Sequence, residues 1–177
     1  MKESWIAILA FSASFAAFAQ GEVNFNTHVG WYSPDYHPIV DARVLNPDGT
    51  GCTDGFGQLF ILNSDESLAP LLPIGAFKKA EAGAGYILAG GAFAPDGFPG
   101  GTTVAMILRA WRGEPESTYD SAIWKGQSEP FTITFATLPN PPGDLIGLKG
   151  FTLVPEPPAL ALGAVGFGAM LLLRRRR

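Results

Sequence analysis

The stretch Thr103-Val104-Ala105-Met106-Ile107-Leu108-Arg109-Ala110-Trp111 decides the fold class of this chain. It is apolar on both alternating faces except at Arg109. This is the pattern of a strand that is covered on both sides at the centre of a sheet. We therefore expect a central β-strand here, around which the remaining strands are arranged.

Short β-prone runs and turn clusters alternate along the rest of the chain at intervals of roughly a dozen residues, which is typical of an antiparallel sandwich. Phe131-Thr132-Ile133-Thr134-Phe135 alternates cleanly, so its aromatic and isoleucine side chains should be buried and both threonines exposed. Asn46-Pro47-Asp48-Gly49 has the residues of a type I turn. One helical turn is expected at 76–82. The central strand is expected over 102–111, and the other expected strands are 22–29, 39–45, 57–62, 85–89, 122–125 and 150–154. The prediction is an all-β fold, an antiparallel β-sandwich of jelly-roll-like or immunoglobulin-like type.

The N-terminal segment 1–19 has the features of a signal peptide. Lys2 supplies a basic start, and the run from Trp5 to Phe18 is apolar apart from two serines. Ala17 and Ala19 are small residues at the two positions that a signal peptidase reads, so we expect cleavage after Ala19. The sequence thus predicts an N-terminal signal helix and export through the secretion translocon.

The C-terminal segment 155–177 has three parts, which are a proline-rich motif, an apolar run and a basic cluster. The run 159–173 holds 15 uncharged residues. As a helix it would span roughly 22 Å, against about 30 Å for the hydrocarbon core of a bilayer, so it is short for a permanent anchor. The cluster Arg174, Arg175, Arg176 and Arg177 favours a cytoplasmic C-terminus. We expect a transmembrane helix at 159–173 that holds the protein transiently.

The motif itself is Val154-Pro155-Glu156-Pro157. Prolines lack backbone donors and favour extended conformations, so a stiff spacer that presents Glu156 outside the bilayer is expected. Motif, helix and arginines in this order resemble the PEP-CTERM sorting signal of Gram-negative bacteria. The resemblance implies an exported protein that the inner membrane holds and that an exosortase processes at or near the motif. A plain C-terminal membrane anchor is the alternative.

Weaker resemblance extends into the body, at 23–26, 46–51 and 147–153, to uncharacterised exported proteins with this signal. The resemblance implies a location at the cell envelope or outside the cell, and an association with exopolysaccharide and biofilm. It assigns no chemistry to any residue of the body.

Between the two signals, residues 20–154 form one domain of ordinary size. Without Glu3, Glu156, Lys2 and the four terminal arginines, 14 acidic and 7 basic residues remain, a net charge of −7. An acidic body argues against nucleic-acid partners, which need basic patches. Cys52 is the single cysteine, so no intramolecular disulfide can form.

The sequence offers little catalytic chemistry. It lacks a Gly-x-Ser-x-Gly elbow, a phosphate-binding loop and a His-Glu-x-x-His motif. We therefore expect no enzyme, no cofactor and no metal site. The oxygens of Asn46, Asp48, Thr50 and Asp54 could bind a calcium ion, but an ordinary hairpin turn explains the same residues.

One alternative function concerns aromatic side chains. Trp31, Tyr32 and Tyr36 cluster around Pro34. Exposed aromatic rings stack on sugar faces, so these three residues form a candidate ligand surface of a carbohydrate-binding module. Their packing at the rim of the sandwich is the simpler interpretation. A third candidate, a hydrolase with a pair of carboxylates, depends on distances that the sequence does not give.

Overall fold

The computed structural model of this chain describes residues 20–30, 38–114 and 116–156. Strand β9 (Thr103–Trp111) lies at the centre of a nine-stranded sheet. It pairs antiparallel with β5 (Phe56–Leu62) on one edge, and with β10 (Trp124–Gln127) and β11 (Phe131–Thr134) on the other. The prediction of a central strand at 103–111 is confirmed.

The large sheet has the order β1-β8-β7-β5-β9-β10-β13, and its pairs are antiparallel. Strand β6 pairs with β5 outside this path. The remaining members are β1 (Val23–Asn26), β6 (Leu68–Pro70), β7 (Gly75–Phe77), β8 (Ile87–Phe93) and β13 (Val154–Pro155). The fold class is therefore all-β, as predicted.

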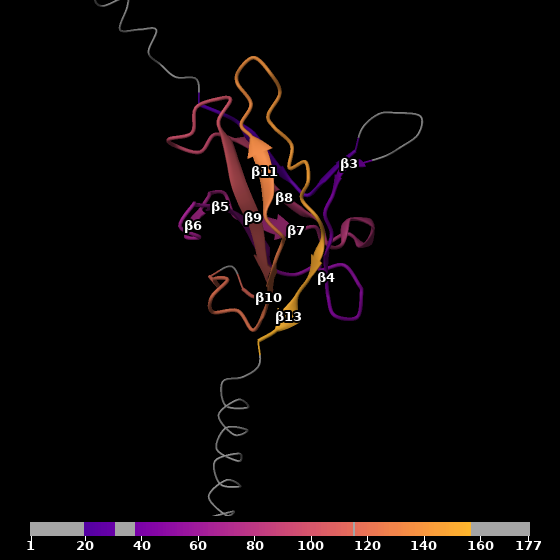
Figure 1. Ribbon diagram of the computed structural model, residues 1–177. Helices are drawn as coiled ribbons and strands as arrows, with labels where there is room; N and C mark the ends of the chain where they lie inside the picture. Colours follow the sequence, from indigo (N-terminus) through magenta and orange to yellow (C-terminus); the bar gives the residue numbers. More distant parts are fainter. Residues whose placement is uncertain (1–19, 31–37, 115, 157–177) are drawn as a thin grey trace, which may run out of the picture.

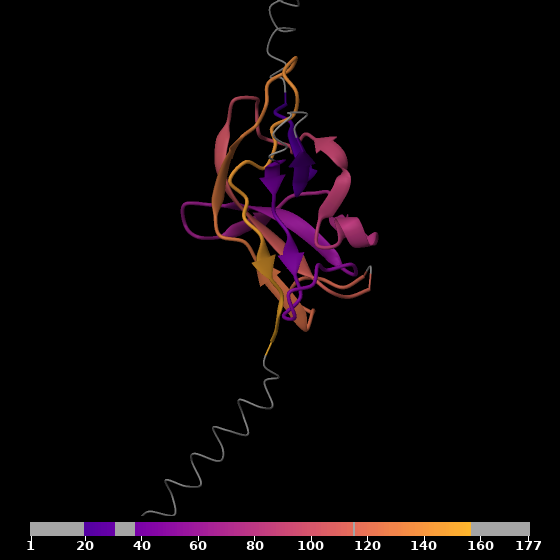
Figure 2. The same ribbon diagram turned by 90° about the vertical axis from the view of Figure 1, so that its right-hand side faces the viewer.

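Two small sheets complete the described fold. Strands β2 (His28–Gly30) and β3 (Pro38–Asp41) form an antiparallel pair. Strands β4 (Val44–Leu45) and β12 (Phe151–Thr152) run parallel, unlike the antiparallel pairing that the sequence predicts. Figure 2 shows the β3–β4 segment and the last described segment side by side at the front of the molecule.

The core joins the large sheet to these smaller segments. Leu59, Met106 and Leu108 of the large sheet are fully buried, in one cluster with Val44 and Leu153 from the segments that cover it. Burial of an apolar side chain of this size contributes about 1.5–3 kcal/mol. In β11 the expected alternation is confirmed, since Phe131, Ile133 and the following Phe135 are buried and both threonines are exposed.

Several expected elements differ from the structure. The strand expected at 85–89 runs instead from Ile87 to Phe93, and β6 and β7 were not expected at all. The helical turn expected at 76–82 is replaced by the end of β7 and a short 3-10 helix, Glu81–Gly83. Trp111 is in the core, as expected, whereas Trp124 is only partly buried.

The first and last described segments lie at opposite ends of the molecule (Figures 1 and 2). The expected signal helix in 1–19 and the expected transmembrane helix at 159–173 fall outside the described residues. Among the residues that are described, no helix has the length and apolar character needed to cross a bilayer.

Candidate functional site

The first three residues of the predicted sorting motif belong to the folded body. Val154 lies opposite Lys125 and Pro155 opposite Trp124 in the β10–β13 pair. The Glu156 backbone N–H donates to the Ile123 carbonyl at 2.8 Å, which extends this pairing by one residue. The motif therefore leaves the body as the last strand of the large sheet.

Lys125 holds the Glu156 side chain. Its Nζ lies 2.8 Å from Glu156 Oε1, and it also donates to the Asp120 carbonyl at 3.2 Å. The ammonium group lies 5.2 Å from the centre of the Tyr119 ring, within the range of a cation–π contact. Only 12% of the Lys125 side chain is exposed, compared with 59% for Glu156. Lys125 is thus a largely buried residue of the body, and Glu156 is its more exposed partner.

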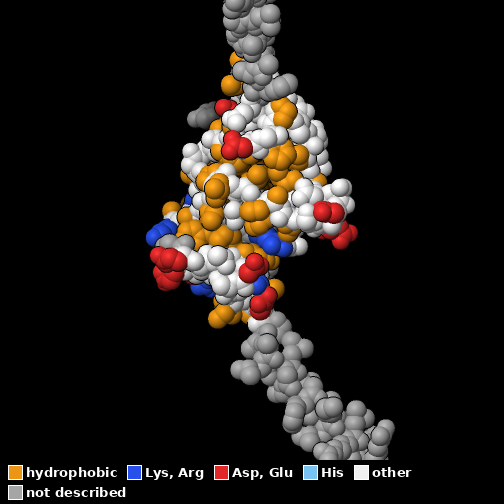
Figure 3. Space-filling model, turned by 90° about the vertical axis from the view of Figure 1, so that its left-hand side faces the viewer, with side chains coloured by type: hydrophobic (Ala, Val, Ile, Leu, Met, Phe, Trp, Pro, Cys, Tyr) orange, Lys and Arg blue, Asp and Glu red, His pale blue; other side chains and the backbone are white. Residues whose placement is uncertain are grey.

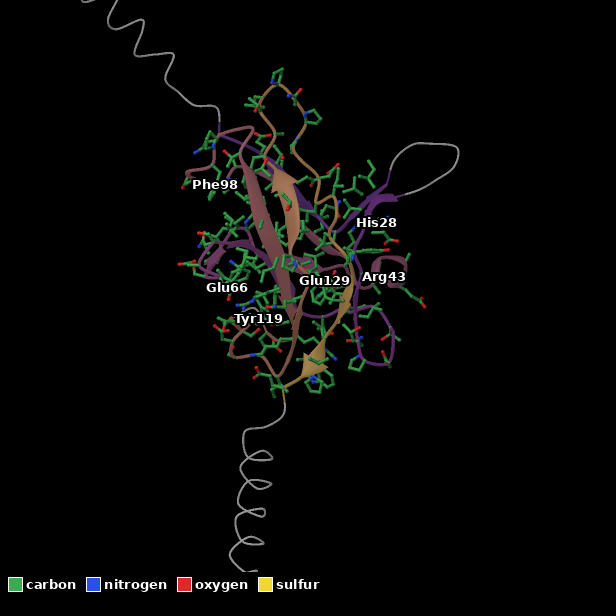
Figure 4. All side chains as sticks on the ribbon, viewed as in Figure 1. His28, Arg43, Glu66, Phe98, Tyr119 and Glu129 are labelled. Atoms are coloured by element: carbon green, nitrogen blue, oxygen red, sulfur yellow. The ribbon has the colours of Figure 1, made fainter. Side chains whose placement is uncertain are left out.

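Tyr119 is itself held in place, near the lower end of β9 (Figure 4). Its ring packs edge-on against Trp111 with centroids 6.4 Å apart. Arg109 lies over the same ring, with its guanidinium carbon 4.5 Å from the centroid. Two residues of the central strand therefore position the aromatic partner of Lys125. The group Tyr119, Asp120, Ile123, Lys125 and Glu156 is called the Glu156 clasp below.

The clasp changes one expectation from the sequence. The sequence predicts Val154 as the end of the last strand and Pro155 and Glu156 as part of a stiff spacer, whereas the structure pairs Pro155 with Trp124 and binds the Glu156 N–H to the Ile123 carbonyl. Proline is compatible with this place because β13 is an edge strand, where a missing N–H breaks no ladder. Pro157, the four arginines Arg174–Arg177 and the signal-peptidase residues Ala17 and Ala19 lie outside the described residues.

The candidate aromatic surface also lies outside the described residues, because Trp31, Tyr32 and Tyr36 fall within the segment 31–37 between β2 and β3. The structure does describe the strands that carry this segment. At their base the rings of His28 and Tyr86 pack at a tilt of 35° with centroids 4.5 Å apart, and Arg43 lies 5.1 Å from the Tyr86 centroid (His28 and Arg43 are labelled in Figure 4).

Asp41 ties Tyr86 to the same group. The Tyr86 hydroxyl donates to Asp41 Oδ1, and His28 Nδ1 lies 3.8 Å from that oxygen. Burial and this hydrogen bond raise the pKa of Tyr86. The group packs at the hairpin that carries 31–37, and His28 Nδ1 is buried there without a hydrogen-bond partner.

The candidate calcium loop is a hairpin turn closed by its own side chains. Asp48 Oδ1 accepts hydrogen bonds from both the backbone and the hydroxyl of Thr50, and Asn46 donates to that hydroxyl at 3.0 Å. These hydrogen bonds lower the pKa of Asp48. Asp54 instead forms an ion pair with Arg112 at 2.9 Å. In the part of the chain that the structure describes, no three His, Cys, Asp or Glu side chains come together as metal ligands.

Cys52 is part of the core rather than of an exposed loop. Its side chain is fully buried, and its thiol donates to Asn46 Oδ1 at 3.0 Å. Burial raises the pKa of the thiol to about 11. A thiol that remains protonated is a poor nucleophile, so this cysteine acts as a small core residue.

A shallow apolar groove lies on the β6 side of the molecule. It is lined by Ile61, Leu71 and Leu72 on one side and by Pro95 and Phe98 on the other. Figure 3 shows hydrophobic side chains gathered over the middle of this face, with acidic side chains towards its margins. The groove brings no group of catalytic side chains together, and Asp96 is its one carboxylate.

Comparisons with models of protein families, with curated proteins and with solved structures found no significant match to this chain.

Proposed function

We propose that this protein is exported, sorted by its C-terminal segment and displayed at the cell envelope or released into the extracellular matrix. One observation carries the proposal. The described body ends on an edge strand at one end of the molecule, and the apolar run 159–173 begins three residues beyond Glu156. Three residues reach at most about 10 Å, so a membrane that takes up this run lies directly against that end.

The form of the body supports the same proposal. We infer a β-sandwich, because the large sheet shares one buried cluster with the segments that carry β3, β4 and β12. The body has a net charge of −7 and is stabilised by packing rather than by a disulfide. These properties suit a soluble module at the cell surface. The partners in this proposal are the translocon, the signal peptidase, an exosortase, the inner membrane and exopolysaccharide.

The carbohydrate-binding alternative depends on Trp31, Tyr32 and Tyr36. The described residues add no argument for it, because these three side chains lie outside them. The proposal therefore remains that of a non-enzymatic matrix or envelope protein whose body has no assigned ligand.

Intact-mass measurement on protein from an exporting Gram-negative host tests the proposal. Cleavage after Ala19 and loss of mass from the C-terminal segment are expected, with the body recovered outside the inner membrane. A variant in which residues 157–177 are replaced by a Gly/Ser segment of equal length should be released without tail processing. Membrane retention of that variant, or a full-length mass for the native protein, would refute the proposal.

A further inference from the structure

We propose that the edge of β10, together with Lys125, forms a built-in peptide-binding site for the segment Val154–Glu156. The site has two parts, a backbone edge and a charge. The edge pairs with Val154 and Pro155, and it also accepts the Glu156 N–H at the Ile123 carbonyl. Addition of an extended peptide to an exposed sheet edge is a common mode of peptide recognition.

Lys125 makes the site specific for an acidic side chain at position 156. Its ammonium group contacts the Asp120 carbonyl and the face of the Tyr119 ring. The Glu156 carboxylate is its third partner, at 2.8 Å. The contacts with the Asp120 carbonyl and the Tyr119 ring do not involve the segment, so they restrict the rotamers of the lysine whether or not the segment is docked. A neutral residue at 156 would leave a largely buried ammonium group without its anionic partner.

A second lysine–glutamate pair provides a contrast within the same molecule. Lys149 and Glu129 lie 3.2 Å apart, and each side chain is 76% exposed. Pairs of this kind contribute little, because water and salt screen them and both side chains lose entropy when they meet. Glu129 is labelled in Figure 4. The burial of Lys125 is what distinguishes the clasp from an incidental surface contact.

The site has a consequence for the proposed function, on which this step rests. A processing enzyme that reads the motif as an extended strand needs the Glu156 carboxylate and a free backbone edge. The body engages the carboxylate, which binds Lys125, and the β10-facing one of the two backbone edges. The body therefore competes with the enzyme, and the fraction of undocked segment limits the rate of processing.

Hydrogen exchange on the uniformly ¹⁵N-labelled full chain in detergent micelles tests the site without any processing enzyme. The Glu156 amide should exchange more slowly than an unstructured amide. Lys125→Met should accelerate its exchange on the order of tenfold, because a hydrogen bond to a charged group is lost. Lys149→Met is the matched control and should leave the exchange unchanged. The amide of Leu108 in β9 should remain protected in every variant and so report that the fold is intact.

Glu156→Gln is the second variant, chosen because this exposed side chain can be altered without disturbing the core. It should accelerate exchange of the amide at position 156 as Lys125→Met does. If Lys125→Met does not fold, Glu156→Gln alone tests the site. An unprotected Glu156 amide in the native chain would overturn the site. Equal exchange in the native chain and in Lys125→Met, or in Glu156→Gln if Lys125→Met does not fold, would overturn it as well. A protected amide in a protein that cells never process would overturn the proposed function alone.

Discussion

Glu66 occupies a backbone conformation that favours glycine, and its replacement by glycine should stabilise the protein. Its φ angle is 66°, and it is the one described residue other than glycine with a positive φ. The turn that contains it, Asn63-Ser64-Asp65-Glu66-Ser67, repeats the hydrogen bonds of the turn Asn46–Thr50 (Glu66 is labelled in Figure 4). In the turn Asn46–Thr50 the position equivalent to Glu66 is Gly49, which has a φ of 83°.

The expected magnitude follows from two opposing terms. A residue with a Cβ loses roughly 1–2 kcal/mol in this conformation. Glycine loses about 0.5–1 kcal/mol more backbone entropy on folding. Glu66→Gly should therefore raise the free energy of unfolding by about 0.5–1 kcal/mol, which corresponds to about 2–4 °C in Tm for a domain of this size. Gly49→Ala should lower the free energy of unfolding by a similar amount, because an added Cβ would touch nothing within 4 Å and only the conformational cost remains.

Urea unfolding followed by tryptophan fluorescence measures both changes, since Trp111 is buried in the native state. Glu66→Ala is the control. It removes the charge but keeps the Cβ, so the unfolding midpoint should barely move. A destabilised Glu66→Gly variant, or equal gains from the glycine and alanine substitutions at position 66, would refute the conformational argument.

Two further predictions concern titratable groups. Because the pKa of Cys52 is raised to about 11, iodoacetamide at pH 8 should leave the native thiol unmodified and label it only in urea; labelling of the folded protein, detected by mass, would contradict the burial. The pKa values of Asp48 and Asp65 are lowered by hydrogen bonds from Thr50 and Ser67. Both carboxylates thus stabilise the fold above their ordinary pKa, and this contribution is lost as the pH falls through the lowered values. Asp48→Asn should flatten the acid limb of a plot of urea midpoint against pH, and an unaltered slope would argue against this role.

The sequence predicts the centre of the fold better than its periphery. The strand 103–111 and the alternating strand 131–135 are set by side-chain patterns, because burial on one or both faces leaves a mark in the sequence. Strands β6 and β7 leave no such mark, since each is only three residues long and contains glycine or proline. They pair with β5 through backbone groups, and backbone pairing does not depend on a hydrophobic pattern.

The candidate site shows the same division. The sequence identifies Glu156 as part of a motif, because the prolines, the apolar run and the arginines follow one another in the chain. It gives no sign of Lys125, which lies more than thirty residues earlier and meets Glu156 only through the β10–β13 pair, or of Tyr119, whose ring lies against Lys125. A single lysine in a polar segment is ordinarily solvated. Its burial between an aromatic ring and a backbone carbonyl is a property of the folded chain.

The Glu156 clasp also shows why the folded body ends later in the chain than the point at which the amino-acid composition changes. Composition changes at Pro155, where the proline-rich motif begins, and the predicted domain accordingly ends at Val154. Folding is governed by pairing instead, and an edge strand tolerates proline as long as one side of its backbone is paired. The sheet therefore extends through Pro155, and the last hydrogen bond to the body is made by Glu156. The proposed sorting segment and the fold share these residues, so any variant cut before Val154 loses an edge strand together with that segment. Removal of the tail beyond Glu156 is the truncation that leaves the described body whole.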